Sequence, residues 1–328
     1  MPVTSVEKDL DALALVIVAD FPVSLRRLWD SYADPRRLER FWGPTDYPAK
    51  FNRHDFFVGG HSHYTMTGPE GDLSSGFWEF LAIDAPHHFE VLDGFAAPDG
   101  TPNLEEPTMR MVFDFAATDG GSRLTMTTHF NAADEYEKLL EMGMEEGTLS
   151  AMSQIDAVVG DQRSFAADQP AAADVLDDTT VRIARVVRGS VEQLWAAYFD
   201  ADVVPRWMLG PDGWSMPSCA IDAEVGGTYA QVWQSDTDEA SYTSTGTFLD
   251  VTAPHHARFT ARLVGDGIPE DAADITHELT FTPVDGGTLV SRVYRYPDTA
   301  TRDAMLAAGI AEGMEASFRR LEATVLMG

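Results

Sequence analysis

Hydrophobic and polar residues alternate with a period of two through the middle of each half of the chain. Between residues 50 and 130 the clearest runs are Met109, Met111, Phe113, Phe115 and, after a turn, Leu124, Met126, Thr128, Phe130. The turn, residues 118–122, contains a Gly-Gly pair of the kind that closes a hairpin. This alternation predicts antiparallel strands with one buried face. A second series of strands is predicted over residues 217–295.

Helical patterns flank both series. Residues 23–32 are expected to form a helix with Ser24 as its N-cap, and Pro35 is placed to begin a short second helix that ends near Trp42. Residues 132–159 are expected to form one long helix. In the second half the helices are predicted at 190–199, 202–208 and 299–326. Buried strands at 13–19 and 181–187 precede them. This order is α+β, and a curved sheet around a long helix encloses a cavity.

The two halves repeat each other. Six landmarks recur about 166 to 168 residues apart, which predicts a duplicated domain rather than a solenoid. They are Leu28-Trp29 and Leu194-Trp195, residues 40–44 and 206–211, Gly59-Gly60 and Gly226-Gly227, Ala85 to His88 and Ala253 to His256, Gly120-Gly121 and Gly286-Gly287, Gly143 to Gly147 and Gly309 to Gly313. We predict domains at 1–165 and 179–328, with 166–178, which is rich in Ala and Asp and contains Pro170, as the linker.

Composition narrows the function. The formal net charge is -30 and the sequence pI is about 4.4, which argues against binding to nucleic acid or to an anionic membrane. The excess of acidic residues is typical of a surface that keeps a protein soluble. The alternative interpretation is an acidic surface that binds a basic partner or is adapted to high salt. Cys219 is the one cysteine, which excludes an internal disulfide and fits the cytoplasm. The first residues do not resemble a signal peptide.

No catalytic motif or cofactor motif is recognisable, so we expect no cofactor and name no catalytic residue. The nearest approach to a metal motif is His61, His63 and Asp55, but the second copy has Thr228 and Ala230 in place of the histidines. Zinc needs three or four protein ligands, and we therefore predict an exposed polar strand face and no metal. The His pairs that follow each Ala-Pro turn have no carboxylate or nucleophile beside them in sequence.

The motifs resemble the activator of Hsp90 ATPase homologue family, a branch of the START-like SRPBCC superfamily. The resemblance is carried by residues 29–44, Gly59-Gly60 and residues 139–147, and by their counterparts at 194–211, 225–229 and 305–314. It implies two helix-grip domains, each with a hydrophobic cavity. Trp78 stands where the second copy has Gly246, so an indole ring is expected to fill part of the first cavity.

Strand alternation gives candidate cavity residues. In the first copy they are Tyr64, Met66, Phe113, Met126 and Met142; in the second they are Tyr229, Gln231, Trp233, Phe281, Arg292 and Tyr294. Arg292 replaces Met126, and an inward guanidinium needs a partner, either a ligand or an acid such as Glu312. The leading hypothesis is binding of a small apolar or amphipathic ligand. The alternatives are a cyclase-like or hydrolase-like enzyme, and a co-chaperone-like partner of a chaperone, which rests on the family analogy alone.

Overall fold

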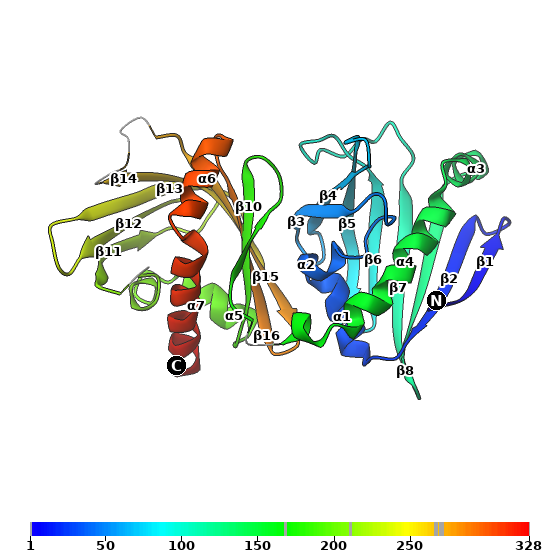
Figure 1. The fold of residues 1–328 in the computed structure, drawn as a ribbon, viewed down its shortest axis with the longest axis horizontal. Coiled ribbons are helices and arrows are strands. Elements are labelled where there is room, and N and C mark those ends of the chain that lie inside the picture. The colour runs from blue at the N-terminus through cyan, green and yellow to red at the C-terminus, as the bar shows by residue number, and fades with distance from the viewer. Residues whose placement is uncertain (1, 167–168, 210–211, 266–267, 269–271, 328) are drawn as a thin grey trace. The chain divides into compact units, whose positions relative to one another are not determined.

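The computed structural model describes residues 2–166, 169–209, 212–265, 268 and 272–327. The chain divides into two compact units, Met1–Ala166 and Ala167–Gly328. Each unit is an antiparallel sheet with helices, so the α+β class and the two helix-grip domains are confirmed (Figure 1).

The first unit begins with a hairpin of two strands and ends with two helices. Among its described residues the sheet has eight strands in the order β1-β2-β8-β7-β6-β5-β4-β3. Its elements are β1 (Val3–Asp9), β2 (Ala14–Phe21), α1 (Leu25–Ala33), α2 (Pro35–Leu38), β3 (Ala49–His54), β4 (His61–Thr67), β5 (Leu73–Asp84), β6 (His88–Phe95), β7 (Met109–Thr118), β8 (Gly121–Phe130), α3 (Ala133–Glu141) and α4 (Met144–Gly160), followed by the short 3-10 helix Gln162–Phe165.

The second unit repeats this plan. Its sheet, read from its last strand, has the order β9-β10-β16-β15-β14-β13-β12-β11, which is the order of the first unit in the part of the chain that is described. Its elements are β9 (Ala172–Val175), β10 (Thr180–Val187), α5 (Val191–Phe199), the 3-10 helix Val204–Arg206, β11 (Trp214–Ile221), β12 (Thr228–Ser235), β13 (Ser241–Thr252), β14 (His256–Gly265), β15 (Ile275–Val284), β16 (Gly287–Arg295), α6 (Thr299–Ala307) and α7 (Ile310–Met327).

Both units carry an edge strand that the sequence analysis did not predict. β1 pairs with β2, and β9 pairs with β10. β9 lies inside the predicted linker, so the linker is shorter than 166–178, and its residues 167 and 168 lie outside the described residues. β9 is held in the sheet by a contact between neighbouring strands. Asp174 on β9 forms an ion pair with the buried Arg182 on β10, and the distance from Arg182 Nη2 to the carboxylate is 3.0 Å.

The last helical segment of each unit is broken by a glycine. Gly143 has φ 82° and Gly309 has φ 79°, a left-handed conformation that a residue with a Cβ adopts at a cost. The predicted helix 132–159 is therefore two helices, α3 and α4. The predicted helix 202–208 is only a 3-10 turn, and the Gly210-Pro211 that ends one repeat landmark lies outside the described residues.

The first helix of each unit begins at a serine. Ser24, the predicted N-cap, accepts a hydrogen bond from the Arg27 amide at 3.3 Å, and Ser190 forms a capping box with Gln193. Trp29 of α1 is buried, and its ring packs edge to face against Phe56, Phe89 and Phe115. Each first helix is thus fixed against its own sheet.

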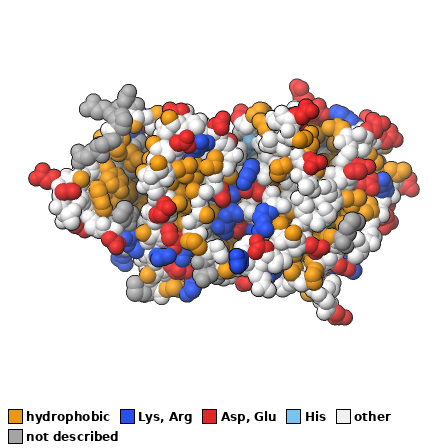
Figure 2. All heavy atoms as spheres, in the orientation of Figure 1, with side chains coloured by type: hydrophobic (Ala, Val, Ile, Leu, Met, Phe, Trp, Pro, Cys, Tyr) orange, Lys and Arg blue, Asp and Glu red, His pale blue; other side chains and the backbone are white. Residues whose placement is uncertain are grey.

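Acidic side chains are scattered over the visible face rather than gathered in one patch (Figure 2). Among the described helices, none is both long and apolar enough to cross a membrane.

Candidate binding cavities of the two domains

The first cavity lies between the sheet and the last two helices of the first unit. It has a volume of about 320 Å³, which is at the small end of the range for ligand pockets. Methionine dominates its wall: Met66, Met109, Met111, Met126, Met142, Met144 and Met152. Methionine side chains are flexible and polarisable, so this wall can adapt to ligands of different shape.

One acidic side chain of this cavity is deeply buried. Asp93 on β6 is 6% exposed, and its Oδ1 accepts hydrogen bonds from Trp78 Nε1 at 2.8 Å and from the Tyr64 hydroxyl at 3.2 Å. Burial raises the pKa of Asp93 to about 7, and these two donors offset the effect only in part. The cavity therefore contains a carboxyl group that is close to its titration point at neutral pH.

Tyr64 reaches Asp93 because the facing residue is a glycine. Tyr64 pairs with Gly76 on β5, and a Cβ on Gly76 would overlap the phenol ring. In the second unit Tyr229 pairs with Gly246 in the same manner, and the Tyr229 hydroxyl is 2.9 Å from Ser244 Oγ. The close approach of a ring to a bare backbone positions one tyrosine in each cavity.

The second cavity occupies the corresponding place in the second unit, with a volume of about 330 Å³. Its wall holds Arg292 on β16, which is 8% exposed. Arg292 Nη2 donates to His277 Nδ1 at 2.6 Å, and the guanidinium carbon lies 5.1 Å from the centre of the Tyr294 ring. Burial, and then the charge of Arg292, lower the pKa of His277 well below its ordinary value, so this imidazole is neutral.

The Arg292 guanidinium has no carboxylate partner among the described residues, and its Nε makes no hydrogen bond to them. The hydroxyl groups of Tyr198 and Tyr296 are likewise buried in this wall without a described partner. Burial raises the pKa of both phenols, and the positive charge of Arg292 partly offsets that effect. Arg292 is therefore close enough to interact electrostatically with both tyrosines. The cavity therefore presents a cluster of buried hydrogen-bond donors.

Most of the predicted cavity residues lie in these walls. Tyr64, Met66, Met126 and Met142 line the first cavity, and Tyr229, Gln231, Trp233, Arg292 and Tyr294 line the second. Phe113 and Phe281 do not. Phe113 stacks on Phe89 beneath α1, with ring centres 4.3 Å apart, and Phe281 packs against Trp195 and Tyr198 of α5. Both rings face the first helix of their unit instead of the last.

The Trp78 ring does not narrow the first cavity as expected, since the two cavity volumes are nearly equal. Trp78 is fully buried and pairs with Ser62, whereas Gly246 at the corresponding position pairs with Tyr229. In both units a large residue pairs with a small one. The large residue is Trp78 on β5 in the first unit and Tyr229 on β12 in the second. The indole serves as the hydrogen-bond donor to Asp93.

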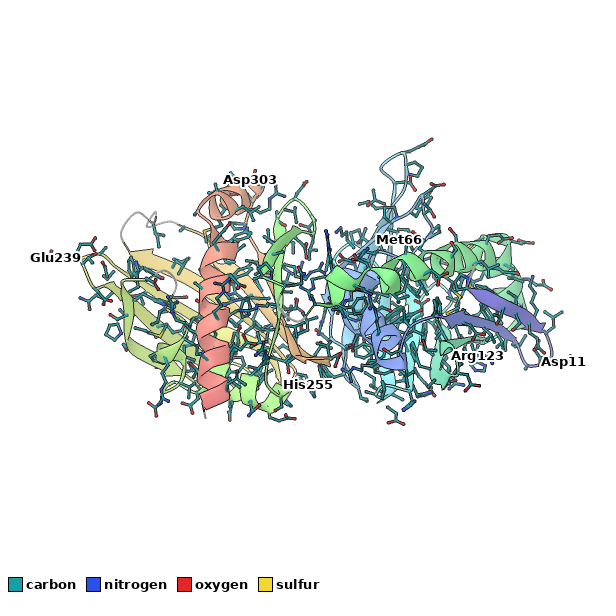
Figure 3. The ribbon with its side chains drawn as sticks, turned by 60° about the horizontal axis from the view of Figure 1, so that its bottom comes forward. Asp11, Met66, Arg123, Glu239, His255 and Asp303 are labelled. Carbon is teal, nitrogen blue, oxygen red and sulfur yellow. The ribbon has the colours of Figure 1, made fainter. Side chains whose placement is uncertain are left out.

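The histidines do not assemble a site within either unit. His63 is buried and packs against Gly100, instead of lying on an exposed strand face. Within each unit, the described His, Cys, Asp and Glu side chains place no three ligand atoms within 4.8 Å of one another. His255 and Asp303 of α6 lie at opposite ends of the second unit, so the His255-His256 turn is remote from the α6–α7 end of the cavity (Figure 3).

Sequence reasoning missed the polar residues Asp93, His277, Tyr198 and Tyr296. Two of them carried a signal in the alternation. Asp93 continues the inward series of Phe89 and Val91, and His277 stands between Ile275 and Leu279. A polar residue in an apolar register predicts a buried polar group.

The family of the chain follows from the two repeats. The family model of "Activator of Hsp90 ATPase homolog 1-like protein" matches residues 22–160 and again 188–325. The chain belongs to this family. Each match begins just after β2 or β10 and reaches the last helix of its unit, which identifies both copies as ligand-binding helix-grip folds.

Single-domain structures resemble one half of this chain at a time. Protein Ms6760 from Mycobacterium smegmatis is 46% identical, with 48% of this chain and 96% of that chain covered, at a TM-score of 0.45. A protein from Arthrobacter aurescens is 43% identical over 48% of this chain and 91% of its own, at a TM-score of 0.46. A search of curated proteins gave no match.

Proposed function

We propose that the second domain of this chain binds a small amphipathic molecule. The acidic or carbonyl head group of the ligand would accept hydrogen bonds from Arg292, and its apolar part would lie against α7. The observation that carries this proposal is the buried donor cluster of Arg292 Nε and the Tyr198 and Tyr296 hydroxyls. An unpaired buried donor costs about 1–3 kcal/mol, and a buried guanidinium costs more.

A ligand carboxylate would satisfy this cluster. Arginine presents a planar fork of donors that matches a carboxylate in two parallel hydrogen bonds, and its charge does not change over ordinary pH. The competing explanation, an internal ion pair with Glu312, has no support among the described contacts of Arg292, which are with His277, Tyr294 and Phe259. His277 is neutral and accepts a hydrogen bond, so it orients the guanidinium without neutralising it.

The test is Arg292→Met, which introduces the residue that the first domain has at this position. We expect octanoate affinity, measured by calorimetry on the full chain, to fall at least tenfold because the charged donor is lost. Thermal stability should stay the same or rise, since a buried charge without a carboxylate is replaced by an apolar side chain.

Arg319→Met is the matched control. It removes an arginine from the exposed side of α7, where Arg319 pairs with Glu315, and octanoate affinity should not change. Unchanged affinity in Arg292→Met would remove Arg292 from the site. Recovery of bound octanoate in chemically altered form would favour an enzyme, the second class of function that this superfamily suggests.

The proposal includes a cytoplasmic setting. Its support is the lone Cys219, which is half-buried near Gln231 and whose pKa is raised by burial, so that the thiol is poorly reactive. A co-chaperone role would rest on the name of the family alone.

A further inference from the structure

The two cavities differ in the sign of their buried polar groups. Ala85-Pro86-His87-His88 and Ala253-Pro254-His255-His256 precede equivalent strands, β6 and β14, and the register from these turns places Asp93 of the first unit where the second has Ala261. Two strands further along each sheet, on β8 and β16, the difference is reversed. Met126, which pairs with Ile17, corresponds to Arg292, which pairs with Ile183.

The partner of Arg292 is exchanged as well. His277 on β15 stands where the first unit has Met111 on β7, since Met111 pairs with Thr128 and His277 pairs with Tyr294 at equivalent places of the last hairpin. The first cavity therefore combines an acid with two methionines, whereas the corresponding positions of the second unit hold an alanine, a histidine and an arginine. Three inward positions change together, and the polar group in each case faces the ligand space.

Asp93 has capacity for a ligand. Both of its described hydrogen bonds end on Oδ1, and no described side chain forms an ion pair with it. A carboxylate has room for about four hydrogen bonds, so Oδ2 remains available in the cavity wall. The surrounding methionines supply an apolar environment in which one ion pair or charge-assisted hydrogen bond is stronger than in water.

We propose that the first domain binds an amphipathic amine, whose ammonium group donates to Asp93 and whose apolar part lies among the methionines. The two domains would then bind ligands with head groups of opposite charge. This inference rests on the proposed function in so far as both cavities take amphipathic molecules, but it concerns a separate site with separate residues.

The experiment compares octylamine, octanol and octanoate on the full chain by calorimetry. Asp93→Asn retains an oxygen that accepts from Trp78 and Tyr64, so the fold should persist. We expect it to weaken octylamine binding at least tenfold, to change octanol binding less than threefold, and to leave octanoate binding unchanged. Octylamine binding as tight in Asp93→Asn as in the unaltered chain would overturn the proposal.

A second variant tests the proposal by a gain of octanoate binding and not only by a loss of octylamine binding. Asp93→Ala, Met111→His and Met126→Arg together give the first cavity the residues of the second. We expect this variant to lose octylamine binding and to bind octanoate at two sites, while Arg292→Met weakens only the octanoate site of the second domain. One octanoate site in the triple variant, with octylamine still bound, would contradict the assignment of Asp93 while leaving the proposal for Arg292 intact.

Discussion

Gly246→Ala is expected to destabilise the second domain by about 1–3 kcal/mol or more, the usual effect of forcing extra atoms into a packed core. A Cβ at this position would overlap the backbone carbonyl oxygen of Thr260 and would lie 2.6 Å from Cε1 of Tyr229. Neither neighbour can yield easily, because Thr260 belongs to the adjacent strand and the Tyr229 hydroxyl is held at Ser244. Hydrogen exchange of β11 to β16 measures the loss directly.

Gly313→Ala is the control in the same domain. Gly313 lies within α7 and an added Cβ meets nothing within 4 Å, so the substitution should be neutral or should stabilise by up to about 1 kcal/mol. Exchange in β3 to β8 of the first unit should be unaltered in both variants. Equal stability of Gly246→Ala and Gly313→Ala would show that the strand and the tyrosine ring do not approach Gly246 closely.

The stability of the first domain is expected to depend on pH through Asp93. Its folded pKa is about 7, against about 3.9 for a free aspartate, so the folded state holds a proton that the unfolded state has released. The stabilisation from this proton is complete below pH 4 and is lost as the pH rises to about 7. The difference is on the order of 4 kcal/mol, at 1.36 kcal/mol for each unit of pKa.

Urea denaturation at pH 5 and pH 8, followed by hydrogen exchange in β5 and β6, measures this effect. Asp93→Asn should be more stable than the unaltered chain by a small margin at pH 5, where only the unfolded state has released the proton, and by a much larger margin at pH 8. Asp119→Asn, in the exposed turn between β7 and β8, is the control and should show no such change. A difference between Asp93→Asn and the unaltered chain that does not vary with pH would contradict the burial of this carboxyl group.

The repeat and the alternation predicted the α+β class of each half, and the family resemblance implied the helix-grip fold. They report burial along one strand at a time, and the inward series that they define include Tyr64, Met126 and Arg292, which lie in the cavity walls. Phe113 and Phe281 follow the same alternation but face the first helix, because alternation gives the face of a sheet and not the position along it.

Other features depend on contacts that no local pattern encodes. β9 is a strand because Asp174 meets Arg182 across the sheet, although its sequence is typical of a linker. The partner of Arg292 proved to be His277, fifteen residues before it, because the β15–β16 hairpin brings the two side chains together. The breaks at Gly143 and Gly309 were visible as repeated glycines, but only their left-handed φ shows that they end a helix.

The most direct test of two cavities with opposite preference is methyl NMR of the chain labelled at its methionines. Seven of the 13 methionines line the first cavity, and Met208, Met305 and Met314 line the second. Octylamine should shift the methyl signals of residues such as Met111 and Met126 and leave those of Met305 and Met314 in place, and octanoate should do the reverse. Shifts of the same methyl groups by both ligands, or of none in either cavity, would contradict the account.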